Sequence, residues 1–272
     1  MGLKTKLLNM PEDITQVENR ELLIEEMLEQ IGSTDAELRD QLIYQKFCDL
    51  ILGDHVPNEK LKEIGLKCIG EQHLLYRLGE NDTDAVFTRS FSALVIVLIL
   101  MKDKERGFLS SSEWKDIYDA TVHYLKEEKD VRGYVEGKGW AHSIAHGADL
   151  LTAVVEHPTY KQELFQECLD TIACCLLREN VYTDDEDERL IFAIEAMMEK
   201  GLTEERVVGW VNDLMESINK AELFSLTYFK YRRNVGSFIK SLYFRLSYKG
   251  VSTAGKEDIL SLMHRFHVEV YK

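Results

Sequence analysis

The feature that most restricts the fold of this chain is the scarcity of residues that interrupt helices. Only three prolines, Pro11, Pro57 and Pro158, occur in 272 residues. Proline lacks a backbone donor and clashes inside a helix, so long stretches without it allow long helices. Between the prolines, apolar residues recur at the spacing of three and four that is typical of amphipathic helices. The sequence therefore predicts an all-α protein.

The helical segments also have a regular spacing along the chain. The pattern indicates about eleven segments, whose starts, taken in pairs, recur every ~44–52 residues, close to the ~40–47 residues of HEAT and armadillo repeats. Neither a strand–helix–strand pattern nor a linker rich in Pro, Gly or Ser is visible. We therefore expect a single domain over residues 1–272, built as a HEAT- or armadillo-like α-solenoid of paired antiparallel helices in a right-handed superhelix.

The longest apolar run is Ala93–Met101, within a segment that begins near Asp82. Its β-branched residues also suit a buried strand, but the helical flanks favour a helix that is buried on most sides. The run is too short for a membrane span, which needs about 20 apolar residues. Farther along, Ser110 and Glu113 have the spacing of a capping box and predict a helix start.

Charge and cysteine usage narrow the class of protein. The formal net charge is −15, which disfavours binding to nucleic acid and to anionic membranes, because phosphates require local Lys and Arg. The five cysteines form no CxxC pair and fall within apolar helical patterns, which indicates reduced, buried thiols. The N-terminus lacks the apolar core of a signal peptide. We expect a cytoplasmic protein. The cysteines are Cys48, Cys68, Cys168, Cys174 and Cys175.

One basic island stands out in this acidic chain, in the stretch from Tyr228 to Leu246. Aromatic residues are interleaved with its cationic side chains, as in some nucleic-acid-binding surfaces. The overall charge weighs against that function, and a helix whose long side chains cover the core while their charges reach water explains the pattern more simply. The cations are Lys230, Arg232, Arg233, Lys240 and Arg245.

The stretch with the most chemical character is DVRGYVEGKGWAHSIAHGAD, residues 130–149. A helix from Gly139 to Glu156 would gather apolar residues on one side and three polar residues, with small neighbours, on the other. The apolar set is Trp140, Ile144, Leu151, Val154 and Val155, and the polar set is His142, His146 and Asp149.

The polar set permits three interpretations. Two histidines four residues apart can share a metal ion such as zinc or manganese, with Asp149 as third ligand and a metal-bound water as nucleophile of a hydrolase. However, the glutamate of an HExxH motif is missing, since Ser143 follows His142. The same face could instead bind a polar ligand or a peptide without metal. Alternatively, the histidines are structural and hold the loop that precedes them.

The loop before these histidines contains Gly133, Gly137 and Gly139, which allow turns that other residues resist. A helix N-terminus favours anions, and Arg132 and Lys138 would add positive charge, but no Ser or Thr follows Lys138 as in a P-loop. A structural turn is the simpler interpretation, with Asp130 and Arg132 paired inside it. Tyr134 and Trp140 could stack on a ligand or pack the loop. Arg89 and Arg233 are candidates to pair with acidic side chains near the site.

The stretch RGYVEGKGWAHSIAHGADLL resembles the signature of an uncharacterised bacterial family, the domain of unknown function DUF2785. FTRSFSAL, Phe87–Leu94, and RRNVGSFIKSLYFRL, Arg232–Leu246, are similar to two further blocks of that family. The similarity extends roughly from Asp82 to the C-terminus. The resemblance implies a mostly helical cytoplasmic protein, and it implies no activity and no catalytic residue.

These observations favour a non-enzymatic binding or scaffold protein. Its polar groove would be centred on His142, His146 and Asp149, with Arg132, Lys138 and Trp140 beside them, and its partner would be a protein or a small polar ligand. The alternative is a metal-dependent hydrolase that uses His142, His146 and Asp149 as metal ligands. Composition and motifs leave open whether the protein is an enzyme.

Overall fold

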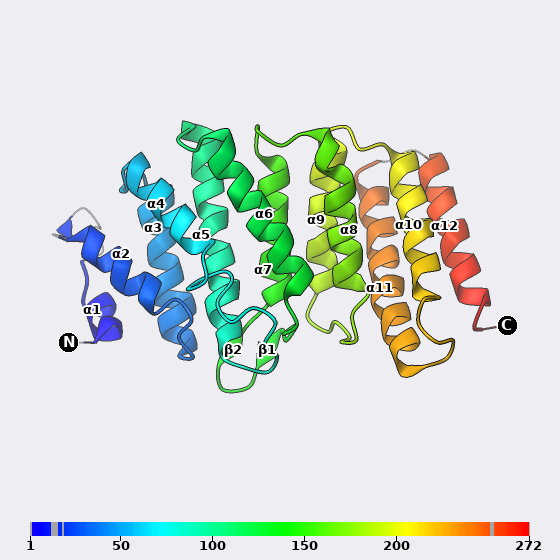
Figure 1. Cartoon of the computed structure of the whole chain (residues 1–272), viewed down its shortest axis with the longest axis horizontal. Helices are drawn as coiled ribbons and strands as arrows, with labels where there is room; N and C mark the ends of the chain where they lie inside the picture. Colours follow the sequence, from blue (N-terminus) through cyan, green and yellow to red (C-terminus); the bar gives the residue numbers. More distant parts are fainter. Residues whose placement is uncertain (1, 12–15, 18, 251–252, 272) are drawn as a thin grey trace. The chain divides into compact units, whose positions relative to one another are not determined.

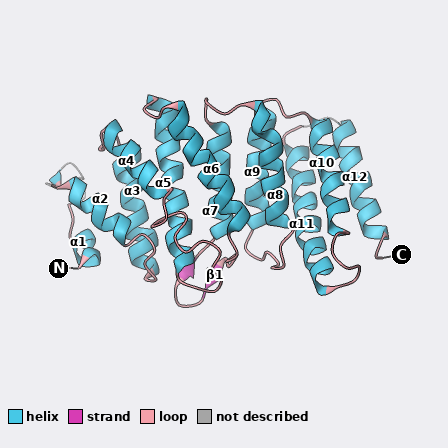
Figure 2. Cartoon of the chain, in the orientation of Figure 1, coloured by secondary structure: helices cyan, strands magenta, loops and turns pink. Residues whose placement is uncertain are grey.

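The computed structural model describes residues 2–11, 16–17, 19–250 and 253–271. Packing separates the chain into two compact units, Met1–Thr159 and Tyr160–Lys272, and each unit is described by itself. Almost all regular structure in the described residues is helical, as the sequence predicts (Figures 1 and 2). Whether the two units form the predicted single domain depends on how they pack together, so the single domain stays a prediction.

The first unit is built around one long buried helix. Its elements are α1 (Leu3–Leu8), α2 (Arg20–Glu29), a π-helical segment (Glu37–Tyr44), α3 (Gln45–Leu52), α4 (Asn58–Cys68), α5 (Ala85–Arg106), α6 (Ser111–Glu127), β1 (Tyr134–Val135), β2 (Gly139–Trp140) and α7 (Ser143–Glu156). Helix α5 packs mainly against α7, and α3 and α4 also pack against α5. The predicted capping box is present, because Ser110 and Glu113 exchange hydrogen bonds at the start of α6.

Helix α5 contains the apolar run Ala93–Met101, and the structure confirms that this run is helical. The helix is long and apolar enough to cross a membrane, but most of its apolar stretch is buried inside the unit. Val95, Ile96 and Ile99 are inaccessible to solvent. Burial on several sides therefore accounts for the width of the apolar face.

The second unit contains a 3₁₀ turn (Gln162–Leu164), α8 (Phe165–Leu176), α9 (Glu186–Glu199), α10 (Glu204–Ile218), α11 (Leu226–Tyr248) and α12 (Thr253–Val268). Helix α11 packs against α9, α10 and α12. The basic island lies on α11, and its cations have different surroundings. Arg245 donates two hydrogen bonds to Glu195 at 2.8–2.9 Å. Other cations of the island line a cavity that is described below.

The described cysteines are all free thiols. Cys68, Cys168 and Cys175 are buried as predicted, and burial raises the pKa of Cys68 to about 12 and that of Cys175 to about 11. The prediction is wrong for Cys174, which is exposed, and Cys48 is partly buried. Thr171 and Ile172 lie on the buried face of α8, and Cys174 lies on the exposed face of the same helix.

Candidate functional site

The segment 130–149 forms a short hairpin followed by helix α7, at the end of the first unit where α5 begins (Figure 1). Strands β1 and β2 pair in antiparallel register, with Tyr134 opposite Trp140 and Val135 opposite Gly139. Gly137 and Gly139 have φ angles of +73° and +81°, in the region that favours glycine. The predicted structural turn is therefore present.

The prediction that the helix starts at Gly139 is wrong, because α7 begins at Ser143. Gly139 and Trp140 are extended in β2, and His142 adopts the left-handed conformation with φ 48° and ψ 39° immediately before the helix. A residue in that conformation cannot continue a right-handed helix. His142 thus marks the point at which the chain turns from hairpin to helix.

The beginning of the segment is attached to a buried ion pair. Arg89 on α5 donates to both carboxylate oxygens of Glu128, at 2.6 and 2.7 Å, and neither side chain is accessible to solvent. Glu128 also accepts a hydrogen bond from the backbone N–H of Asp130 at 2.9 Å. The expectation that Arg89 pairs with an acidic side chain near the site is confirmed, and this pair sets the position from which the hairpin starts.

The start of α7 is held by a second set of buried hydrogen bonds. The Ser143 hydroxyl donates to the carbonyl oxygen of Asp130, and the Tyr124 hydroxyl donates to the carbonyl oxygen of Ser143 at 3.0 Å. Gly147 allows the close approach of α6, since a Cβ at this position would lie 2.6 Å from Leu125 Cδ2. Helix α7 therefore starts on a fixed support provided by α6.

Arg39, in the π-helical segment, supports the other side of the hairpin and was missed by the sequence analysis. Its guanidinium donates to the carbonyl oxygens of Lys138 at 2.9 Å and Trp140 at 3.4 Å, and its side chain is fully buried. It also lies 4.3 Å from the centre of the Phe87 ring. A signal existed in the sequence: Arg39 precedes Ile43 and Phe47 at intervals of four, which places it on a buried helix face.

Burial dominates the electrostatics around Arg39. The neighbouring Asp40 carboxylate lies 2.8 Å from Arg39 Nε. Burial lowers the pKa of the Arg39 guanidinium and raises the pKa of the Asp40 carboxyl group, while the attraction between the two groups opposes both changes. The buried cation is stabilised by carbonyl oxygens, by the Asp40 carboxylate and by the Phe87 ring, although Arg39 Nε makes no hydrogen bond of good geometry.

The two loop cations proposed as anion ligands are engaged with acidic side chains. Arg132 donates to both oxygens of Asp130 at 2.6–2.7 Å, which confirms the predicted pair, and this hydrogen bond raises the pKa of Arg132. Lys138 Nζ lies 2.6 Å from Asp84 Oδ1. Arg132 also donates to the carbonyl oxygen of Thr83 at 2.8 Å. These contacts tie the hairpin to the start of α5, and an anionic ligand would have to compete with them.

Aromatic and imidazole rings form a row across the segment. Trp140 contacts Tyr134 edge to face with centroids 5.0 Å apart, and it stacks on the His142 ring at 4.4 Å and 4°. His142 and His146 have ring centroids 5.7 Å apart, and His146 contacts Phe91 edge to face at 5.4 Å. The row runs from exposed rings on the hairpin to the buried ring of Phe91.

The predicted apolar side of this region requires one correction. Ile144, Leu151, Val154 and Val155 are fully buried, as expected for the core side of α7. Trp140 is instead 42 % exposed, because it lies in β2 and not in the helix. The helical-wheel placement therefore held for residues inside α7 and was wrong for Trp140, which precedes it.

His142, His146 and Asp149 are all partly exposed. The His142 and His146 rings lie next to each other across the start of α7, and the predicted grouping of both histidines with Asp149 stays a prediction. Among the described residues, however, no group of three or more His, Cys, Asp or Glu side chains is placed to hold a metal ion. The geometry therefore gives no support to a three-ligand zinc or manganese centre, and the metal-dependent hydrolase stays a prediction.

The fold and the site define a predominantly helical protein. It has one short hairpin that is held in place by side chains of other elements, and a row of aromatic and imidazole rings crosses that hairpin. Within that class, the chain belongs to DUF2785. The family model described as "Protein of unknown function (DUF2785)" matches residues 74–244, a range that includes α5, the hairpin and α7. No curated protein sequence and no solved structure matches the chain.

Proposed function

We propose that the protein is a binding or scaffold protein whose interaction surface is the braced hairpin. This surface is defined as Tyr134, Trp140 and His142, together with the partly exposed His146 and Asp149 of α7. The observation that carries the proposal is the pair Tyr134 and Trp140, which are 56 % and 42 % exposed although their rings contact each other. Large aromatic side chains are normally buried, and they are enriched among the residues that dominate protein–protein binding energy.

The bracing of the hairpin supports this assignment. Arg39 binds carbonyl oxygens on both sides of Gly139, Lys138 pairs with Asp84, and the carbonyl oxygen of Gly133 accepts a hydrogen bond from the N–H of Ala141 at 2.7 Å. Such a surface loses little conformational entropy when it binds, so more of the contact energy remains as affinity. An exposed aromatic pair on a loose loop would lack this advantage.

We take the partner to be a protein or peptide. Trp and Tyr provide a large contact area at a small cost in rotamer entropy, and the neighbouring imidazoles and Asp149 supply polar groups at the edge of the surface. The cations Arg132 and Lys138 support the surface through their ion pairs and do not point to an anionic ligand.

Two predictions made from the sequence are kept within this proposal. The HEAT-like solenoid is supported by the packing of successive helices within each unit, such as α6 against α7 and α8 against α9. A cytoplasmic location is supported by the free thiols.

The test compares proteins captured by three forms of the full chain from a lysate of the organism that encodes it. The forms are the natural chain, the variant Y134A/W140A, and the control F244A/Y248A, which removes another exposed pair of contacting rings. We expect at least one protein to be captured by the natural chain and the control but not by Y134A/W140A. That protein is then purified and titrated against all three forms. Capture that never depends on Tyr134 and Trp140 would contradict the proposal.

A further inference from the structure

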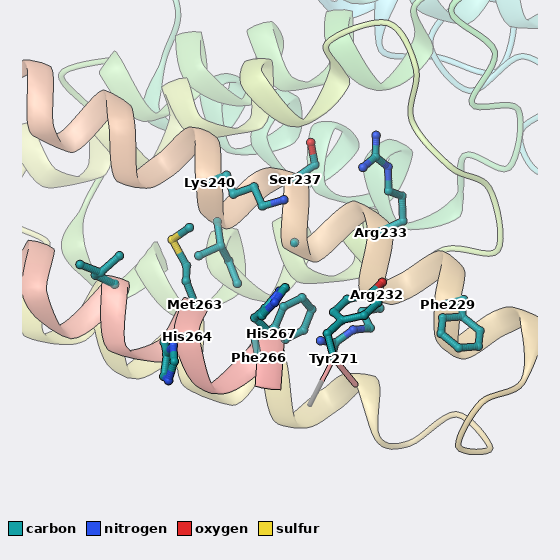
Figure 3. A pocket seen from close by; sticks show the side chains of 13 residues that line it. Phe229, Arg232, Arg233, Ser237, Lys240, Met263, His264, Phe266, His267 and Tyr271 are labelled. Atoms are coloured by element: carbon teal, nitrogen blue, oxygen red, sulfur yellow. The ribbon is translucent and has the colours of Figure 1, made fainter. Parts of the chain in front are cut away.

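A cavity lies between α11 and α12 in the second unit, away from the hairpin in the sequence (Figure 3). Its volume is about 540 Å³, within the range of roughly 300–1,000 Å³ that is typical of small-molecule sites. Much of its wall is apolar, formed by side chains of both helices: Phe229 and Ile239 on α11, and Leu260, Met263 and Phe266 on α12. The cavity therefore suits a ligand with an apolar body.

The side chains of this cavity wall that carry a formal charge are all cationic. They are Arg232, Arg233 and Lys240 on α11, and the imidazole rings of His264 and His267 line the cavity from α12. No Asp or Glu is among the described residues of its wall. In a chain with a net charge of −15, such a wall is unusual and favours an anion.

The three cations have different roles. Arg232 is buried, lies 3.8 Å from the centre of the Phe266 ring, and has its Nη1 atom 3.5 Å from a carboxylate oxygen of Glu269. It supports the wall, and its charge is partly balanced. Arg233 and Lys240 are exposed and stand seven residues apart, on the same face of α11 after two turns. These two side chains are therefore the ones positioned to meet a ligand anion.

Helices α11 and α12 approach each other closely at one glycine of α11. At Gly236, on the same face of α11, a Cβ would lie 3.0 Å from Phe266 Cε1. Glycine at this position therefore allows Phe266 to pack closely against α11. Arg233 and Lys240 line the same cavity from α11 (Figure 3).

We propose that this cavity binds a small amphiphilic anion, in which an apolar or aromatic body carries a carboxylate, sulfonate or phosphate group. The body would lie against Leu260, Met263 and Phe266, and the anionic group would contact Arg233 and Lys240. A nucleic-acid strand fits less well, because its binding depends on many phosphate contacts along a continuous positive path, and here two exposed cations flank a largely apolar wall. This site is separate from the braced hairpin and does not rest on the function proposed for it.

The test uses two probes that share one ring system, anilinonaphthalene sulfonate and its uncharged parent, phenylnaphthylamine. Both become fluorescent in apolar surroundings, and only the first carries an anion. The full chain is titrated with each probe, as the natural form, as R233E/K240E and as the control K230E. Lys230 lies on the same helix but does not line the cavity. Melting temperatures are measured alongside, to show that each variant is folded.

We expect R233E/K240E to bind the sulfonate at least about tenfold more weakly, a change of about 1.4 kcal/mol, while its affinity for the uncharged probe and both affinities of K230E stay the same. L260S should weaken both probes, because it removes apolar wall. The proposal is overturned if charge reversal leaves sulfonate binding unchanged, if both probes weaken equally in R233E/K240E, or if a labelled oligothymidylate binds this site more tightly than the sulfonate.

Discussion

Arg89 and Glu128 form a two-point ion pair that is completely buried between α5 and the end of α6. Glu128 is also the C-cap residue that directly follows α6, and its carboxylate accepts a hydrogen bond from the N–H of Asp130. One carboxylate thus neutralises a buried cation and fixes Asp130, four residues before Tyr134 of the braced hairpin. The position of the proposed interaction surface depends on this contact.

The first prediction concerns this pair. Replacement of Glu128 by Gln keeps the size of the side chain but removes the ion-pair partner that the buried Arg89 cation contacts directly. Removal of one partner of a buried ion pair costs about 3 kcal/mol or more. We expect a correspondingly large fall in the free energy of unfolding, measured with denaturant. The matched change E127Q, at the neighbouring exposed acid, should have little effect. Equal stability of E128Q and the natural chain would contradict this account.

The second prediction separates backbone strain from packing in the hairpin. Gly137 and Gly139 both have positive φ, so alanine at either position should cost about 1–2 kcal/mol. At Gly139 a Cβ would also lie 2.9 Å from the Ala36 Cβ and 3.1 Å from Arg39 Nη2, whereas at Gly137 it would enter open space. G139A should therefore lower the melting temperature clearly more than G137A. Equal melting temperatures would show that Arg39 does not pack closely against the hairpin.

The third prediction concerns pH and the buried His73. Burial, followed by the charge of Lys67, lowers the pKa of His73 below its ordinary value of 6.5, against smaller opposing effects of a backbone hydrogen bond and Glu25. The unfolded chain therefore binds this proton more readily than the folded chain. Stability from His73 is complete above pH 6.5 and decreases as the pH falls below that value.

The measurement is the free energy of unfolding of the natural chain and of H73Q between pH 7.5 and pH 5.0, a range chosen to span about one and a half units below the ordinary histidine pKa of ~6.5. The natural chain should lose more stability than H73Q over this range. Parallel curves for the two proteins would mean that His73 is not held in its neutral form.

The fourth prediction uses tryptophan emission. The chain has three tryptophans, and Trp114 and Trp210 are 3 % and 7 % exposed whereas Trp140 is 42 % exposed. Acrylamide in solution should therefore quench Trp140 preferentially. In W140F, most of the quenchable emission should disappear, and in W210F it should remain. Strong quenching that persists in W140F would show that Trp140 is not the exposed ring.

The sequence allowed prediction of those parts of the structure that depend on local patterns. Helix α5, the Ser110–Glu113 capping box and the buried face of α7 follow from spacing and capping rules that act within a few turns. The glycine turn and the Asp130–Arg132 pair could also be predicted, because the residues that form them are close together in the sequence. The DUF2785 resemblance rested on contiguous residue blocks, and the family match confirms it.

The remaining features depend on contacts between residues that are distant in the sequence. Arg39 contacts the carbonyl of Lys138 across 99 positions, which no local pattern can indicate. The start of α7 was placed too early because the periodicity of apolar residues continues through Trp140, whereas β2 and the left-handed His142 interrupt the helix. The cavity of the second unit was likewise hidden, since the basic island was visible in the sequence but the facing residues of α12 were not.

Tyr134 and Trp140 on the braced hairpin are proposed to bind a protein. The most direct test of this proposal is the dissociation constant of the co-captured, purified partner for the natural chain, for W140A and for the control F244A. We expect W140A to lose about 2 kcal/mol or more of binding free energy, roughly 30-fold in affinity, and F244A to bind as the natural chain does. Equal affinities for the natural chain and W140A would contradict the proposal.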